Sequence, residues 1–146
     1  MPFPTLDNFG PTRQTLQRYA RALSGVARVH GVAHPNWWHI SLRVTPSGLQ
    51  GDNIPLPGGG ILAGRLDLLR HQLVVWTSGG REWALPLDAR LSGTAMGEKV
   101  IAAVAEAGLY GDYDRQKFAS DAPGVYDAGA VGRFFAALVK ADRLLK

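Results

Sequence analysis

Two short stretches of the sequence, NWWHISLRV and RLD, hold most of the side chains that can bind a ligand or move a proton. They contain Trp37, His39, Arg43, Arg65 and Asp67. An imidazole beside a carboxylate can act as a general acid or base, whereas guanidinium groups hold anions through paired hydrogen bonds. An indole offers a flat surface for stacking. We therefore consider two functions for this set: binding of a small anionic ligand, which we favour, and proton transfer by His39 oriented by Asp67.

The alternation of side chains along a β-strand predicts that this set lies on one face of a sheet. Residues 37–44 and 61–68 both have the composition of strands. If these two strands pair, the five side chains gather on one face, and the opposite face is a core that includes Leu62, Leu66 and Leu68. A simpler interpretation is that the polar face is only the solvated side of the sheet, with exposed ion pairs that contribute little stability.

His71 adds a third candidate, beside His39 and Asp67, for acid–base chemistry. These three residues lack the HxH or HExxH spacing of common metal sites, so we expect no metal ion. Asp67 and His71 flank the predicted turn LLRH, and their simplest role is to stabilise that turn. The GGG at 58–60 is followed by no Gly-Lys-Ser/Thr and cannot be a phosphate-binding loop, so we also expect no cofactor.

Hydrophobic periodicity and turn chemistry predict the elements that position these residues. The predicted helices span 12–30, 93–108 and 128–144, and the predicted strands span 37–44, 61–68, 72–77 and 82–87. Residues 48–56 can add one or two short strands, which Pro55 confines to an edge. Strands separated by turns favour antiparallel pairing. The sequence therefore predicts a single α+β domain over residues 1–146, irregular over 1–11, in which one N-terminal and two C-terminal helices accompany an antiparallel sheet of about 4–6 strands.

Capping residues set the expected ends of the helices. Thr12 is the expected N-cap of the first helix, Ser92 or Thr94 of the second and Asp127 of the third. Gly108 is the expected stop of the second helix.

The composition fits a globular domain and excludes several functions. The chain has 146 residues, no cysteine and a formal net charge of +4. Without cysteine there can be no disulfide, thiolate metal site or cysteine nucleophile. No stretch approaches the roughly 20 apolar residues of a membrane span. The N-terminus also lacks the pattern of a secretory signal, so we expect a cytoplasmic protein.

The positive charge and an isoelectric point near 9.8 raise one further hypothesis, nucleic-acid binding through the first helix. That helix carries Arg13, Arg18, Arg21 and Arg28. The remaining Lys and Arg residues are scattered and interleaved with acidic residues. This pattern argues against a surface that follows a phosphate backbone.

Several motifs resemble those of a known family. They are TLQRY at 15–19, NWWHISLRV at 36–44, RLDLLRHQL at 65–73 and DAPGVYDAGAVGRFF at 121–135. Over residues 12–140 the chain is similar to the bacterial domain-of-unknown-function family 5996, and it corresponds to the first half of a typical member. The resemblance implies no known activity, but it singles out Trp37, Trp38, His39, Asp67, His71, Asp121, Tyr126 and Asp127. Because a half-length member can rebuild an interface with a second copy, we also consider a homodimer.

Overall fold

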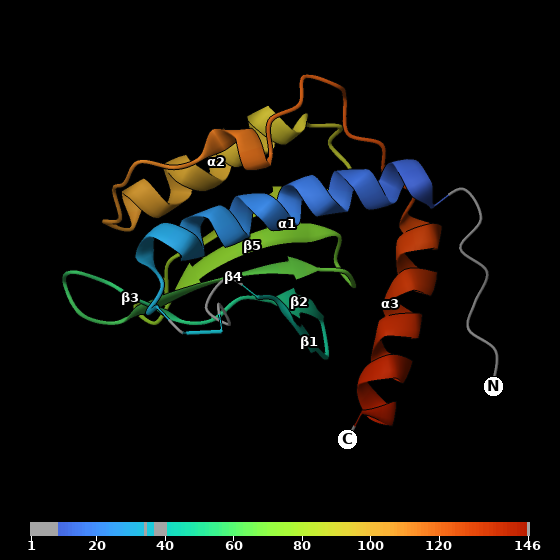
Figure 1. Cartoon of the computed structure of the whole chain (residues 1–146), viewed down its shortest axis with the longest axis horizontal. Coiled ribbons are helices and arrows are strands. Elements are labelled where there is room, and N and C mark those ends of the chain that lie inside the picture. Colours follow the sequence, from blue (N-terminus) through green and yellow to red (C-terminus); the bar gives the residue numbers. More distant parts are fainter. Residues whose placement is uncertain (1–8, 34, 37–40, 146) are drawn as a thin grey trace.

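The computed structural model of the chain describes residues 9–33, 35–36 and 41–145. Within these residues a six-stranded antiparallel sheet is covered on one face by helices α1 (Gly10–His30) and α2 (Gly93–Glu106), and helix α3 (Ala128–Leu144) stands beside the sheet (Figure 1). A short 3-10 helix, η2 (Arg115–Lys117), lies in the connection between α2 and α3. No helix in the described part of the chain is long and apolar enough to cross a bilayer. The predicted α+β class, with one N-terminal and two C-terminal helices, is confirmed.

All strand pairs of the sheet are antiparallel. The strands are β1 (Arg43–Thr45), β2 (Gly48–Gln50), β3 (Ile54–Pro55), β4 (Ile61–Asp67), β5 (Gln72–Thr77) and β6 (Glu82–Pro86). Their order is β1-β2-β4-β5-β6, and β3 also pairs with β4. Strands β4, β5 and β6 match the predicted strands to within one residue at each end. Strands β2 and β3 are the two short strands expected within 48–56.

The predicted strand over 37–44 is confirmed only at its end. Strand β1 begins at Arg43, and residues 37–40 lie outside the described part of the chain. Within the described residues, the condition of direct pairing between this strand and 61–68 is not met, because β2 pairs with both β1 and β4. A Cβ atom on Gly48 would lie 2.0 Å from the backbone oxygen of Leu66. A glycine at this position therefore lets β2 turn back from β1 and fit against β4.

The core lies between α1, α2 and the helix-covered face of the sheet. The apolar sides of α1 and α2 contribute the buried residues Leu16, Tyr19, Leu23, Val26, Met96, Val100 and Val104. The sheet contributes Leu62, Leu66, Leu68, Leu73 and Val75 to the same cluster. The leucines expected to point inward therefore do so, and burial of this apolar surface is the main term that holds the helices on the sheet.

Two of the three predicted helix caps are present. The Asp127 side chain accepts a hydrogen bond from the backbone N–H of Ala130 at 3.1 Å, and α3 has the predicted bounds. Ser92 caps α2 in the same way, accepting from Ala95 at 3.0 Å. Both are side-chain caps of the kind that contribute about 1 kcal/mol each.

The predicted N-cap of α1 is wrong. The helix begins at Gly10, two residues before Thr12, with Pro11 in its first turn. Proline suits this position because its fixed φ is helical and its missing N–H would be unpaired there. Thr12 instead accepts a hydrogen bond from the backbone N–H of Asp127 at 3.1 Å, which joins the start of α1 to the start of α3.

Candidate ligand site on the sheet

The register of the sheet places Arg43 and Arg65 in one row on the face opposite the helices. Arg43 pairs with Gln50, Gln50 with Arg65, and Arg65 with Val74. Directly paired residues of antiparallel strands point to the same face, and Asp67, two residues beyond Arg65 on β4, shares that face. The alternation of side chains thus predicts this part of the arrangement correctly.

Arg65 is held in place by an aromatic ring and a carboxylate. Its Cζ atom lies 4.6 Å from the centroid of the Trp76 ring, and its Nε lies 3.6 Å from Oδ2 of Asp67. The Arg65 side chain is 22% exposed, and its buried Nε has no hydrogen-bond partner within the described residues. Stacking and pairing restrict the rotamers of the side chain. The guanidinium group is therefore pre-positioned by its neighbours.

Asp67 is committed to the turn between β4 and β5. It is 2% exposed, and its Oδ1 accepts hydrogen bonds from the backbone N–H groups of Leu69 at 3.1 Å and Arg70 at 2.9 Å. An aspartate that accepts from residues two and three positions later stabilises the turn it begins. The turn-stabilising role predicted for Asp67 is confirmed. The expectation of an exposed ion pair is wrong for Arg65 and Asp67, because the carboxylate is buried beneath its own turn.

A hollow of about 220 Å³ lies beside Arg65 and Trp76, and we call it the Arg65 hollow. It is lined by Arg65, Trp76, Thr77, Gly80, Arg81 and Glu82. The guanidinium group of Arg81 lies over the Trp83 ring, 4.7 Å from its centroid. The lining therefore contains two guanidinium groups and the Glu82 carboxylate, and the Asp67 carboxylate lies beside Arg65, so the charges around the Arg65 hollow nearly balance.

Arg43 lies outside the Arg65 hollow. Its side chain is 61% exposed, and its Nη1 lies 3.7 Å from Oδ1 of Asp52, which is also exposed. An exposed ion pair of this kind contributes about 0–1 kcal/mol. The insertion of β2 between β1 and β4 keeps Arg43 one strand further from Arg65 than direct pairing would.

Trp37 and His39 lie outside the described residues, so their part in the site stays a prediction. The indole that the structure places against Arg65 belongs to Trp76, which the predicted site does not contain. Alternation within 72–77 groups Trp76 with Val74 but does not say which face the pair shares. The register decides it, because Trp76 pairs with Ala63 on the same face of β4 as Arg65.

His71 contacts a tyrosine from the other end of the chain. Its Nδ1 lies 2.5 Å from the hydroxyl oxygen of Tyr126, and the two rings meet edge to face. Burial raises the pKa of Tyr126, and the nearby Asp88 raises it further, so the phenol stays neutral. This contact joins the β4–β5 turn to the residue that precedes the N-cap of α3. The described part of the chain contains no group of three His, Cys, Asp or Glu residues that could hold a metal ion.

A model of the Family of unknown function (DUF5996) matches residues 2–146 of the chain. The chain belongs to this family. The match confirms the resemblance and extends beyond the span of 12–140 over which the motifs carried it. The comparisons found no matching curated protein and no matching solved structure.

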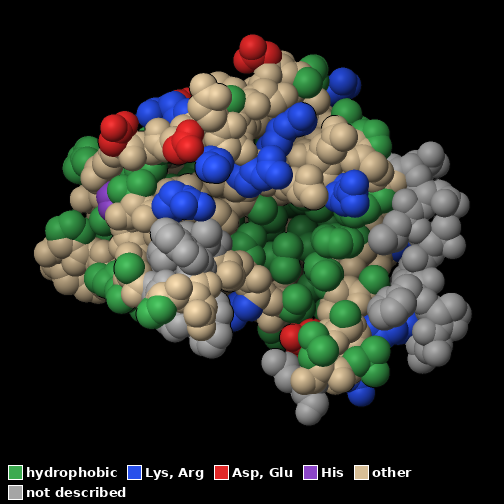
Figure 2. Space-filling model, viewed as in Figure 1, with side chains coloured by type: hydrophobic (Ala, Val, Ile, Leu, Met, Phe, Trp, Pro, Cys, Tyr) green, Lys and Arg blue, Asp and Glu red, His purple; other side chains and the backbone are tan. Residues whose placement is uncertain are grey.

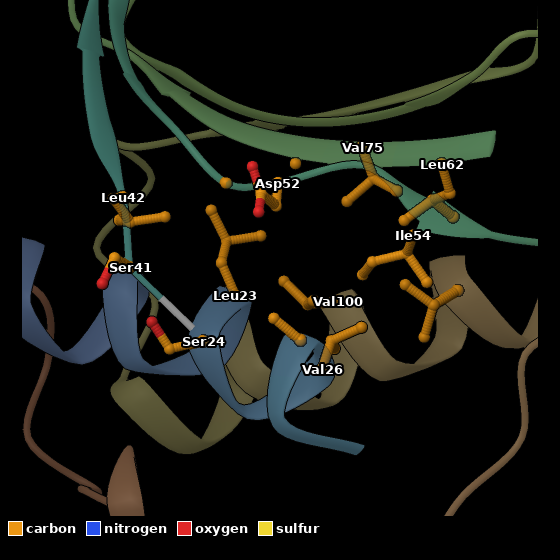
Figure 3. A pocket seen from close by; sticks show the side chains of 14 residues that line it. Leu23, Ser24, Val26, Ser41, Leu42, Asp52, Ile54, Leu62, Val75 and Val100 are labelled. Atoms are coloured by element: carbon orange, nitrogen blue, oxygen red, sulfur yellow. The ribbon is translucent and has the colours of Figure 1, made fainter. Parts of the chain in front are cut away.

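This DUF5996 chain also has a small cavity inside its core, between α1 and the helix-covered face of the sheet (Figure 3). Its walls are mainly aliphatic, with Leu23, Val26, Ile54, Leu62, Val75 and Val100 around it and Ser24, Ser41 and Asp52 also lining it. The cavity measures about 20 Å³, which is room for about one water molecule. It is therefore a packing space and too small to be a ligand site.

Proposed function

We propose that this DUF5996 chain binds a small anionic ligand, through a carboxylate or phosphate group, in the Arg65 hollow. The observation that carries the proposal is how the Arg65 side chain is held by its neighbours. Its guanidinium group is held by Trp76 and Asp67, and its buried Nε has no hydrogen-bond partner within the described residues. A planar guanidinium held in this way can donate two parallel hydrogen bonds to one anionic group.

The expected affinity follows from the few groups that supply it. A charge-assisted pair of hydrogen bonds contributes about 1.5–3 kcal/mol. A ligand with a flat ring gains about 0.5–1.5 kcal/mol more if the ring stacks on the indole. Together these terms, about 2–4.5 kcal/mol, correspond to a dissociation constant between about 0.5 and 30 mM. A ligand whose body fills the hollow binds more tightly, because it also buries apolar surface.

A thermal-shift screen with small carboxylates and phosphates tests the proposal. A ligand at about 100 times its dissociation constant stabilises the folded chain by about 2.7 kcal/mol, which raises Tm by roughly 5–10 °C. We expect this shift to be lost in Arg65→Met and reduced in Arg65→Lys, because an ammonium group cannot form the bidentate contact.

Arg21→Gln is the matched control, because Arg21 is an exposed arginine on α1, away from this face of the sheet. Equal shifts in Arg65→Met and in the wild type would place the bound anion elsewhere and overturn the proposal. An Arg43→Ala variant measures how far the site extends along the row: a partial loss would show that the ligand reaches from β4 to β1.

A further inference from the structure

A second concave surface lies on the helix-covered side of the sheet, opposite the Arg65 hollow, between α1 and α3. Figure 2 shows it as a hollow of hydrophobic side chains below the basic side chains that lie over α1. The hollow measures about 240 Å³ and is lined by Phe9, Arg13, Leu16, Gln17, Ala20, Leu49, Leu66 and Phe134. We call it the α1–α3 groove. A concave apolar surface with a few polar groups is typical of small-molecule sites.

The groove exists because α3 stands at the edge of the sheet instead of covering it (Figure 1). The rings of Phe9 and Phe134 stack with their centroids 4.9 Å apart, so α3 is joined to the start of α1. Leu49 on β2 and Leu66 on β4 pair directly and form the sheet side of the groove. The groove is therefore walled by two helices and the sheet. Such a shape suits a narrow chain better than the flat surface of a partner protein.

The charge around the groove selects the kind of ligand. Helix α1 contains no acidic residue, and Arg13 lines the groove from its first turns. The guanidinium group of Arg13 is exposed and makes no ion pair within the described residues. A ligand with an apolar tail and an anionic head would therefore bury the tail against the leucines and phenylalanines and set its head on Arg13.

We propose that the α1–α3 groove binds a medium-chain monocarboxylate, with its carboxylate on Arg13. The groove has about twelve times the space of the core cavity that holds about one water molecule, which accommodates a tail of roughly eight to ten carbons. The site is separate from the Arg65 hollow. Arg65 and Leu66 are consecutive residues of β4, and their side chains point to opposite faces of the sheet.

Isothermal titration with decanoate, below its critical micelle concentration, and with decanol, below its solubility limit, tests this proposal. We expect saturable binding of decanoate by the wild-type chain, and roughly tenfold weaker binding of decanol, which lacks the charge that Arg13 recognises. The variant Arg13→Gln should bind decanoate about as weakly as the wild type binds decanol. Arg21→Gln, on the same helix but outside the groove, should keep wild-type affinity.

Filling the groove gives a second readout. Ala20→Phe should abolish binding of both ligands, and Ala20→Leu, a smaller change, should weaken both if the larger variant does not fold. Arg65→Met should leave decanoate binding unchanged, which separates this proposal from the one above.

Three results would overturn the proposal. The first is the absence of saturable decanoate binding by the folded wild type. The second is binding that survives both Arg13→Gln and Ala20→Leu, or that is lost in Arg65→Met. The third is a dimer, seen by light scattering, whose formation is blocked by Ala20→Leu, because a second copy of the chain would then be the occupant of the groove.

Discussion

Removal of the Asp67 carboxylate should destabilise the chain far more than removal of an exposed aspartate. Asp67→Ala deletes two hydrogen bonds to backbone N–H groups, and it leaves Arg65, 22% exposed, without its carboxylate partner. The freed N–H groups belong to exposed residues and can bind water, so each bond contributes about 1 kcal/mol. The unpaired guanidinium adds about 1–2 kcal/mol, less than in a fully buried pair. We therefore expect a loss of about 3–4 kcal/mol in the free energy of unfolding.

The assay is urea denaturation followed by circular dichroism, with the slope of the transition checked for constancy. Asp67→Asn keeps an acceptor for the turn but loses the charge, so it should cost about 1–2 kcal/mol. Asp52→Ala is the matched control. It removes the other aspartate that pairs with an arginine of this sheet face, but the pair is exposed and the expected change is below about 0.5 kcal/mol. Equal losses in Asp67→Ala and Asp52→Ala would refute the assignment of a structural role to the buried carboxylate.

Two other predictions concern helix packing and pH. A Cβ atom on Gly97 of α2 would lie 1.9 Å from the Phe118 ring, whereas one on Gly132 of α3 would meet no atom within 4 Å. Chemical denaturation should therefore show that Gly97→Ala lowers the free energy of unfolding by about 1–3 kcal/mol, whereas Gly132→Ala raises it by about 0.5–1 kcal/mol. A chain that is destabilised by Gly132→Ala and stabilised by Gly97→Ala would contradict the packing described. Burial lowers the pKa of His30, which lies 2.6 Å from the Tyr113 hydroxyl through its Nε2. The unfolded chain therefore protonates His30 more readily than the folded chain does. The stability that neutral His30 contributes is complete above pH 6.5 and is lost as the pH falls through the lowered folded-state pKa. In urea titrations between pH 7 and about 5, the free energy of unfolding should consequently fall less in His30→Gln than in the wild type. If it falls equally in both, burial of His30 does not affect stability.

Local signals predicted much of the fold. The bounds of α3 follow from Asp127, whose cap depends only on the three residues after it. The β4–β5 and β5–β6 hairpins follow from alternation and from short turns between strands that are neighbours in sequence. The start of α1 was placed too late because Thr12 looks like a local cap. Its hydroxyl in fact contacts Asp127, 115 residues away, and such a partner leaves no local signal.

In the candidate site, too, the sequence predicts what depends on neighbouring residues and misses what depends on residues far along the chain. Alternation alone places Arg43, Arg65 and Asp67 on one face. It does not give the strand order, and the position of β2 between β1 and β4 depends on the close approach of Gly48 to β4. The partner of Arg65, Trp76, follows from pairing register, a tertiary property. The contact between His71 and Tyr126 spans 55 residues and could be foreseen only as two members of one family pattern.

The most direct test of the proposed anion site is an NMR titration that follows the side-chain Nε–Hε signals of the arginines. The Arg65 signal, assigned by its loss in Arg65→Lys, should shift and saturate when an anion from the thermal-shift screen is added. The Arg21 signal should stay unchanged. An Arg65 signal that does not move while the chain is measurably stabilised by the same anion would show that the ligand binds elsewhere and would contradict the account.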